Sequence, residues 1–178
     1  MALTRLIVTG ANGAGKSWFA RRLSMRRPDL QVMSYDALQL AENWVKRPPE
    51  DIACAASAVI DRNTWVLEGG PSLLRLALPR AQGVIWLDPP GAVRAWRLTA
   101  RPWKNFGKVR AELPDGNVDW PLQQYAFALR SLRKGRRFRA SIKASLDANP
   151  PEHLWHARSH CDVDAALEDV VKLLADGS

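Results

Sequence analysis

The amino-acid sequence predicts a three-layer α/β fold, in which five parallel strands form one sheet with helices on both faces. Three observations support this prediction. Short apolar, β-branched runs alternate with helical patterns along the chain. Some of these runs are continuously apolar, as strands covered on both faces are. The chain has 178 residues, of which 47% are apolar, so residues 1–178 are expected to form one domain with a full core.

The first strand, residues 6–9, runs into a glycine-rich loop that matches the phosphate-binding pattern G-x-x-x-x-G-K-S/T. A stretch without glycine or proline follows and predicts a helix. Glycines adopt backbone angles closed to other residues, and N–H groups at a helix N-terminus attract an anion. The predicted nucleotide-binding residues are Gly10, Ala11, Asn12, Gly13, Ala14, Gly15, Lys16, Ser17 and Trp18.

Three residues at the end of this loop have distinct expected roles. Lys16 is expected to reach the β- and γ-phosphates of ATP, and the Ser17 hydroxyl to bind Mg²⁺. Trp18 stands where many such loops carry a second hydroxyl residue, available to the α-phosphate. We interpret Trp18 as a core aromatic residue on the first helical turn; the alternative places it near the nucleotide, where it changes how the nucleotide is held.

Acidic residues follow the second and third strands. The second strand is predicted at residues 30–35, and Asp36 follows it. A carboxylate at the carboxyl end of a parallel strand faces the crevice where such sheets bind ligands. Asp36 could hold Mg²⁺ through water, accept a proton from a substrate hydroxyl, or simply cap the next helix. The third strand, residues 64–67, precedes Glu68 and Gly69, which we assign to substrate binding; Glu68 could also orient water on Mg²⁺ or be a turn residue.

Two helical patterns, residues 37–46 and 50–61, separate the second strand from the third, with two prolines between them. A plain crossover between strands needs only one helix. Residues 37–63 are therefore predicted to form a small flap that clamps the substrate.

The second half of the chain carries an arginine-rich segment. After the fourth strand, a helix over residues 92–100 carries Arg97, and Arg101 shares its face because it lies four positions on. Residues 101–120 lack regular periodicity and predict a lid, followed by a helix over residues 121–134. The sheet is completed by strands at residues 83–87 and 152–157, and Asp162 could cap a last helix over residues 163–175.

The net charge of +8 is unevenly distributed, because 13 of the 26 lysines and arginines lie between residues 94 and 143, beside three acids. Such an excess implies an anionic partner, either a nucleic acid or a polyphosphate. No apolar run is long enough to span a bilayer, and no signal-peptide pattern is present, so we expect a cytoplasmic protein with no membrane partner. Cys54 and Cys161 match no metal spacing and are expected to be buried thiols.

Several motifs carry a resemblance to a known family. They are the G-A-N-G-A-G-K-S loop, Tyr35-Asp36, the W-V-L-E-G run that starts at Trp65, and the V-I-W-L-D-P-P run that starts at Val84. With these, the chain resembles the small P-loop kinases of the adenylate kinase-like group and, more narrowly, the bacterial DNA topology modulation (FlaR-related) kinases. Glu68 stands where adenylate kinases carry Asp before Gly.

The resemblance implies a nucleoside monophosphate kinase-like P-loop NTPase fold, ATP and Mg²⁺ as cofactors, and a small phosphoryl acceptor. The Arg97-x-x-x-Arg101 pair is similar to the pair that opens the lid in adenylate kinases. Arg133 and Arg137 are our candidates for contacts to the transferring phosphate. The expected catalytic residues are therefore Lys16, Asp36, Arg97, Arg101, Arg133 and Arg137, and the expected metal-binding residues are Ser17, Asp36 and Glu68.

Three functions remain open from the sequence. The favoured one is ATP-dependent phosphoryl transfer to a nucleoside monophosphate or a related metabolite. The second is a kinase of a different acceptor, such as a sugar acid, with Asp36 as base toward a hydroxyl. The third, a nucleotide-dependent nucleic-acid-binding protein, is the least favoured because no nucleic-acid-binding motif is present. We expect a monomer or a homodimer.

Overall fold

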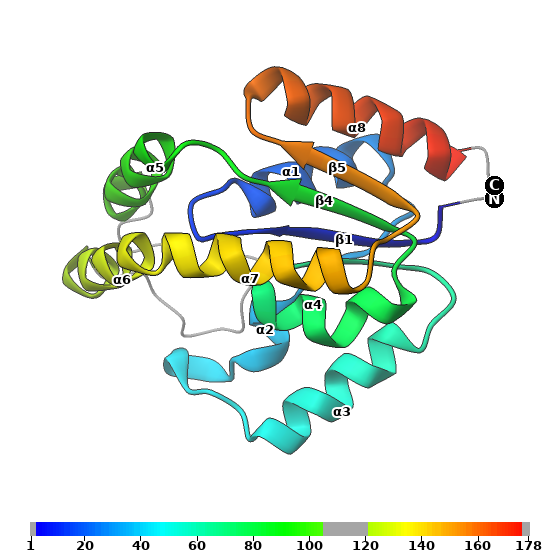
Figure 1. The fold of residues 1–178 in the computed structure, drawn as a ribbon. Helices are drawn as coiled ribbons and strands as arrows, with labels where there is room; N and C mark the ends of the chain where they lie inside the picture. Colours follow the sequence, from blue (N-terminus) through cyan, green and yellow to red (C-terminus); the bar gives the residue numbers. More distant parts are fainter. Residues whose placement is uncertain (1–2, 105–120, 176–178) are drawn as a thin grey trace.

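The structure, a computed structural model, describes residues 3–104 and 121–175. Its sheet has five strands in the order β2-β3-β1-β4-β5, and every pair is parallel (Figure 1). The strands are β1 Arg5–Gly10, β2 Val32–Ser34, β3 Trp65–Gly69, β4 Gly83–Leu87 and β5 His153–Ala157. The predicted α/β fold is confirmed. Because β1 is the central strand, the loop that follows it opens at the middle of the carboxyl edge of the sheet.

Helices cover both faces of this sheet (Figure 1). The α-helices are α1 Lys16–Arg26, α2 Tyr35–Gln39, α3 Pro49–Ile60, α4 Pro71–Ala77, α5 Gly91–Lys104, α6 Pro121–Arg133, α7 Gly135–Ala148 and α8 His160–Ala175, and two 3₁₀ turns are η1 Glu42–Trp44 and η2 Leu78–Arg80. Side chains of α1 and α8 form the core on one face, whereas α3, α4 and α7 form the core on the other.

Successive side chains of β1 point to opposite faces of the sheet, and both faces are covered, which explains why the sequence of β1 is continuously apolar. Leu6 and Val8 pack on the α1 and α8 side, and Ile7 packs on the opposite side; all three are fully buried. A strand with a helix layer on each face needs apolar side chains at every position. The unbroken apolar runs of the sequence therefore place the sheet between two helical layers.

The segment after β2 differs from its predicted course. α2 begins at Tyr35 and ends at Gln39, so Asp36 lies inside its first turn, and the interpretation of Asp36 as an N-cap is wrong. The predicted helix over residues 37–46 is wrong in its second half, because Asn43 has a positive φ of 56° and an antiparallel bridge joins Leu40 to Lys46. The next helix, α3, lies close to its predicted place. The role of residues 37–63 as a flap stays a prediction.

The lid prediction, residues 101–120, is only partly covered by the described residues. α5 continues through Lys104, so the first four of these residues are helical rather than irregular. Residues 105–120 lie outside the described part of the chain. The assignment of a lid stays a prediction.

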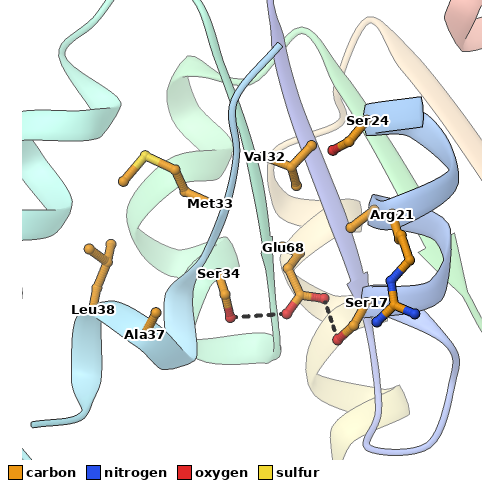
Figure 2. A pocket seen from close by; sticks show the side chains of 10 residues that line it. Ser17, Arg21, Ser24, Val32, Met33, Ser34, Ala37, Leu38 and Glu68 are labelled. Carbon is orange, nitrogen blue, oxygen red and sulfur yellow. Dashed lines mark hydrogen bonds between the residues drawn. The ribbon is translucent and has the colours of Figure 1, made fainter. Parts of the chain in front are cut away.

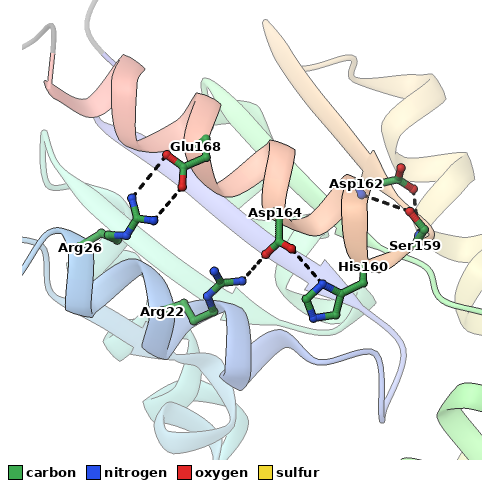
Figure 3. Close-up of polar contacts among 7 residues, drawn as sticks. All are labelled: Arg22, Arg26, Ser159, His160, Asp162, Asp164 and Glu168. Atoms are coloured by element: carbon green, nitrogen blue, oxygen red, sulfur yellow. Dashed lines mark hydrogen bonds and ion pairs between the residues drawn. The ribbon is translucent and has the colours of Figure 1, made fainter.

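The start of α8 also differs from expectation. Ser159 precedes the first helical residue, and Asp162 is the third residue of the helix. The Asp162 N–H donates to Ser159 Oγ at 3.1 Å, and the Ser159 N–H donates to Asp162 Oδ2 at 2.9 Å, which together form a capping box (Figure 3). Backbone hydrogen bonds from Arg158 and Ser159 lower the pKa of Asp162. The N-cap assignment of Asp162 is therefore wrong by three positions.

Two further expectations concern the surface. Within the described residues, no helix combines the length and the apolar character needed to cross a bilayer. Cys54 and Cys161 are both exposed, so the expectation of buried thiols is wrong. Cys54 lies on α3 and Cys161 is the second residue of α8, and both face away from the cores that their helices form.

Candidate active site around the phosphate loop

The phosphate loop has the conformation that its glycines permit. Gly10, Gly13 and Gly15 have positive φ angles of 154°, 79° and 105°. A Cβ at Gly10 would lie 2.4 Å from the Leu87 carbonyl oxygen of β4, so no larger residue fits there. Gly15 is the N-cap of α1, and no side chain caps this helix start. The first N–H groups of α1 therefore have no capping side chain and are arranged as in an anion site, and the binding of a nucleotide there stays a prediction.

Arg94 supports the loop from behind, a role that sequence analysis missed. Its side chain is buried, and Nε donates to the Asn12 carbonyl oxygen at 3.0 Å. Asn12 Nδ2 in turn donates to Ser131 Oγ of α6 at 3.0 Å. Burial lowers the pKa of Arg94, and the negative charge of Asp88 partly opposes this shift. The only sequence signal for this role was the position of the arginine near the start of the helix after β4. That position does not show whether the arginine is buried or exposed.

The predicted catalytic arginines occupy different environments. Arg97 Nη1 donates to the Ala14 carbonyl oxygen at 2.8 Å, so this guanidinium contacts the loop backbone. The Arg101 side chain lies outside the described residues. Arg133 and Arg137 are exposed, and neither side chain forms a hydrogen bond or an ion pair with another described residue. Arg97 therefore lies against the loop, where its guanidinium donates to a backbone carbonyl oxygen of the loop.

A buried carboxylate lies beside the loop on its other side. β3 extends to Gly69, so Glu68 lies within the strand, in register with Ser34 of β2. Ser34 Oγ donates to Glu68 Oε1 at 3.1 Å, and Ser17 Oγ donates to Oε2 at 3.2 Å (Figure 2). Gly69 is also buried, and an added Cβ would lie 3.0 Å from Tyr35 Cβ, so close packing accounts for this glycine.

The electrostatics of Glu68 show which charges surround it. Burial raises the pKa of Glu68, the positive charge of Lys16 and the Ser34 hydrogen bond lower it, and the negative charge of Asp36 raises it further. Both Lys16 and Asp36 therefore lie close enough to act on this carboxylate. The structure brings together four of the predicted site residues, namely Lys16, Ser17, Asp36 and Glu68.

A pocket of about 370 Å³ opens next to this cluster (Figure 2). Arg21 and Ser24 of α1 contribute to its wall, and sequence analysis missed both. Their spacing from Ser17, four and seven positions, is the signal that could have identified them, since such residues share one helix face. Asp36 is not a wall residue. The full lining is Ser17, Ala20, Arg21, Ser24, Val32, Met33, Ser34, Ala37, Leu38 and Glu68.

The polar groups at the mouth of this pocket fit a magnesium ion. The Ser17 hydroxyl and the Glu68 carboxylate are adjacent oxygen donors, 3.2 Å apart. Mg²⁺ prefers oxygen ligands and usually takes only one or two from the protein, the others coming from phosphates and water. In the part of the chain that the structure describes, no three His, Cys, Asp or Glu side chains cluster as a metal site of their own.

Trp18 is not a core residue, so that interpretation is wrong. Its side chain is 45% exposed, whereas the next residue, Phe19, is fully buried. The Trp18 ring lies edge-on to His160, with 5.6 Å between ring centroids, and Arg22 Cζ lies 4.7 Å from the centroid of the indole. Because successive helical positions point about 100° apart, Phe19 faces the sheet and Trp18 faces the start of α8.

Comparisons with known proteins agree on the fold. No protein-family model and no curated protein sequence matches the chain. Among solved structures, shikimate kinase from Acinetobacter baumannii in complex with shikimate matches with 14% identity and a TM-score of 0.51, over 99% of this chain and 95% of that one. Shikimate kinase from Bacteroides thetaiotaomicron matches with 17% identity and a TM-score of 0.54, over 98% and 99%.

A third match, TT1252 from Thermus thermophilus, has 16% identity and a TM-score of 0.51, over 98% of this chain and 99% of that one. All three identities lie below 25%, and what these similarities show is a shared fold, the parallel five-stranded sheet between two helical layers. The resemblance to adenylate kinase-like and FlaR-related kinases stays a prediction.

Proposed function

We propose that this protein is an ATP-dependent phosphotransferase that acts on a small acceptor bound in the pocket beside α1. One observation carries the proposal: the Ser17 hydroxyl lies 3.2 Å from Glu68, and both residues line the pocket. The side of the phosphate loop that we propose to hold Mg²⁺ therefore opens onto a pocket of about 370 Å³, within the usual range for small-molecule sites.

The residues around the pocket have separable roles. The N-terminus of α1 and Lys16 would hold the phosphates of ATP, and Ser17 with Glu68 would hold Mg²⁺. When bound, the ion would neutralise charge that develops on the transferred group. Arg133 and Arg137 are proposed to add positive charge, because both are exposed and neither side chain forms an ion pair with a described residue.

Two acceptor classes fit this site, and the pocket favours the second. A nucleoside monophosphate carries a phosphate dianion, which proteins bind with several cations. Of the described residues that line the pocket, Arg21 is the only arginine or lysine. A hydroxyl-bearing carboxylic acid, such as a sugar acid, needs one cation and one proton acceptor. Arg21 in the pocket wall would supply the cation, and Asp36, which lies outside the wall but close enough to act on Glu68, would supply the proton acceptor. One similar structure contains shikimate, a hydroxylated carboxylic acid.

In the proposed reaction, the acceptor hydroxyl oxygen forms a bond to the γ-phosphorus of ATP. The bond from that phosphorus to the β–γ bridging oxygen breaks, and ADP leaves. Asp36 takes the hydroxyl proton. Positioning and charge neutralisation supply most of the acceleration in such transfers, which is consistent with a site built from a loop, a lysine and two acids.

The test is ADP release from Mg-ATP, with panels of nucleoside monophosphates and of hydroxy acids. We expect one panel to stimulate turnover and the Lys16→Ala substitution to abolish it. With a hydroxy acid, Arg21→Ala should raise the acceptor KM about tenfold without changing the ATP KM. Arg75→Ala, at an exposed position on α4, is the matched control. Turnover equal in wild type and Lys16→Ala would refute the proposal.

A further inference from the structure

Two consecutive residues at the start of α1 face opposite sides of the phosphate loop. Ser17 points to Glu68 on β3 and into the acceptor pocket, with 3.2 Å between its Oγ and Glu68 Oε2 (Figure 2). Trp18 points to α8, where its ring meets His160 at a centroid distance of 5.6 Å. The loop therefore has a polar side, where the buried Glu68 lies, and an aromatic side.

The Trp18 ring is held in place although it is exposed. Arg22 Cζ lies 4.7 Å from the ring centroid, an arrangement typical of a cation–π contact. Arg22 also forms an ion pair with Asp164, and Asp164 Oδ2 lies 2.9 Å from His160 Nδ1 (Figure 3). These contacts close a ring of four side chains between α1 and α8. An indole that keeps 45% of its surface exposed, yet is fixed by its neighbours, is suited to contact a ligand.

The order of the phosphates decides which part of ATP lies beside Trp18. In the proposed reaction the γ-phosphate must face the acceptor, which lies on the Ser17 and Glu68 side. The loop N–H groups hold the α- and β-phosphates at the N-terminus of α1. The nucleoside must then leave the loop on the side away from the acceptor, which is the side where Trp18 and His160 lie.

We propose that Trp18 is a donor-site residue that packs against the nucleoside of ATP, with Arg22 and His160 holding its ring in place. This inference rests on the proposed function and names the part of the nucleotide that Trp18 recognises. Aromatic side chains stack on any base, so the contact adds affinity for a nucleotide over a bare polyphosphate. It replaces the α-phosphate contact that a hydroxyl residue would make at this position.

The test compares the affinities of two ligands, Mg-ADP and Mg-tripolyphosphate, by titration calorimetry. For Trp18→Ala we expect ADP to bind about tenfold more weakly and tripolyphosphate to bind with unchanged affinity. Trp18→Phe keeps an aromatic ring and should retain most of the ADP affinity. Lys16→Ala should weaken both ligands. Trp96→Ala is the matched control, because Trp96 is 74% exposed on α5 and should change neither affinity.

Each outcome separates this inference from the proposed function. If Trp18→Ala leaves ADP affinity unchanged while Lys16→Ala weakens it, the inference is wrong and the proposed function stands. If Trp18→Ala lowers the affinities for ADP and tripolyphosphate equally, Trp18 supports the loop instead, and this result would also overturn the inference. Should Trp18→Ala fail to fold, Trp18→Leu replaces it with the same expected ratio. Wild-type protein that binds neither ligand would overturn both.

Discussion

Arg94 and Arg133 carry the same charge, and both come from helices at the carboxyl edge of the sheet, yet their surroundings are opposite. Arg94 is 8% exposed, and its Nε donates to the Asn12 carbonyl oxygen of the loop. Arg133 is exposed, and its side chain forms no hydrogen bond or ion pair with another described residue. A guanidinium that donates its hydrogen bonds to backbone carbonyl groups stabilises the conformation of the loop. One with free donors can bind a phosphate, so position in the fold decides the role of each arginine.

The largest effect is expected from Arg94→Met. Removing the guanidinium leaves the half-buried Asn12 carbonyl without this donor, and should lower the free energy of unfolding by about 2–3 kcal/mol. Urea denaturation measures this change. Nucleotide affinity should fall as well, because the loop loses its support. The exposed residue Arg136 is the control, and Arg136→Met should change stability by less than about 0.5 kcal/mol. A stable Arg94→Met protein with normal ATP affinity would contradict the supporting role.

A smaller effect, on turnover alone, is expected from Arg133→Ala and Arg137→Ala. Each should lower kcat about tenfold without changing the free energy of unfolding, because an exposed cation contributes little to folding. Steady-state kinetics and urea denaturation test both parts. Arg97→Ala is the informative comparison, since Arg97 bonds the Ala14 carbonyl oxygen at 2.8 Å. The Arg97→Ala substitution should lower the free energy of unfolding and weaken ATP binding, and it should leave kcat nearly unchanged. The reverse pattern would return Arg97 to the catalytic role that its sequence position suggested.

The smallest expected effect is the pH dependence of stability that comes from Glu68. Like Arg94, Glu68 is a buried charged residue, but its charge is negative. Burial raises the pKa of folded Glu68 above its ordinary value of 4.5. The folded state therefore binds more protons than the unfolded state above pH 4.5, so this group makes the protein less stable as pH rises toward the folded pKa.

Glu68→Gln removes this dependence and can keep hydrogen bonds to Ser17 and Ser34. The stability of wild type relative to Glu68→Gln, measured by urea denaturation without divalent metal, should be highest at low pH and decline as pH rises. A difference that instead increases with pH would mean that the attraction of Lys16 outweighs the cost of burial.

The predictions from sequence were most accurate where a local pattern has one physical solution. The phosphate loop follows from glycines whose positive φ angles other residues avoid. β4 lies at its predicted residues because an unbroken apolar run must be covered on both faces. The approach of Glu68 to Ser17 follows from adjacent parallel strands ending at one edge. Helix boundaries were less accurate, as α2 shows, because capping contacts determine them.

The sequence by itself therefore determined the fold, the conformation of the glycine-rich loop and the acid that lies beside it, since each depends on short-range patterns of glycine, apolar and charged residues. Only the tertiary structure decided that Arg94 is buried and that Trp18 is exposed. Arg94 is buried because its side chain, which comes from α5, lies between the loop and α6. Trp18 faces α8, a helix more than a hundred residues away along the chain. Such contacts depend on how whole elements pack, which no local pattern specifies.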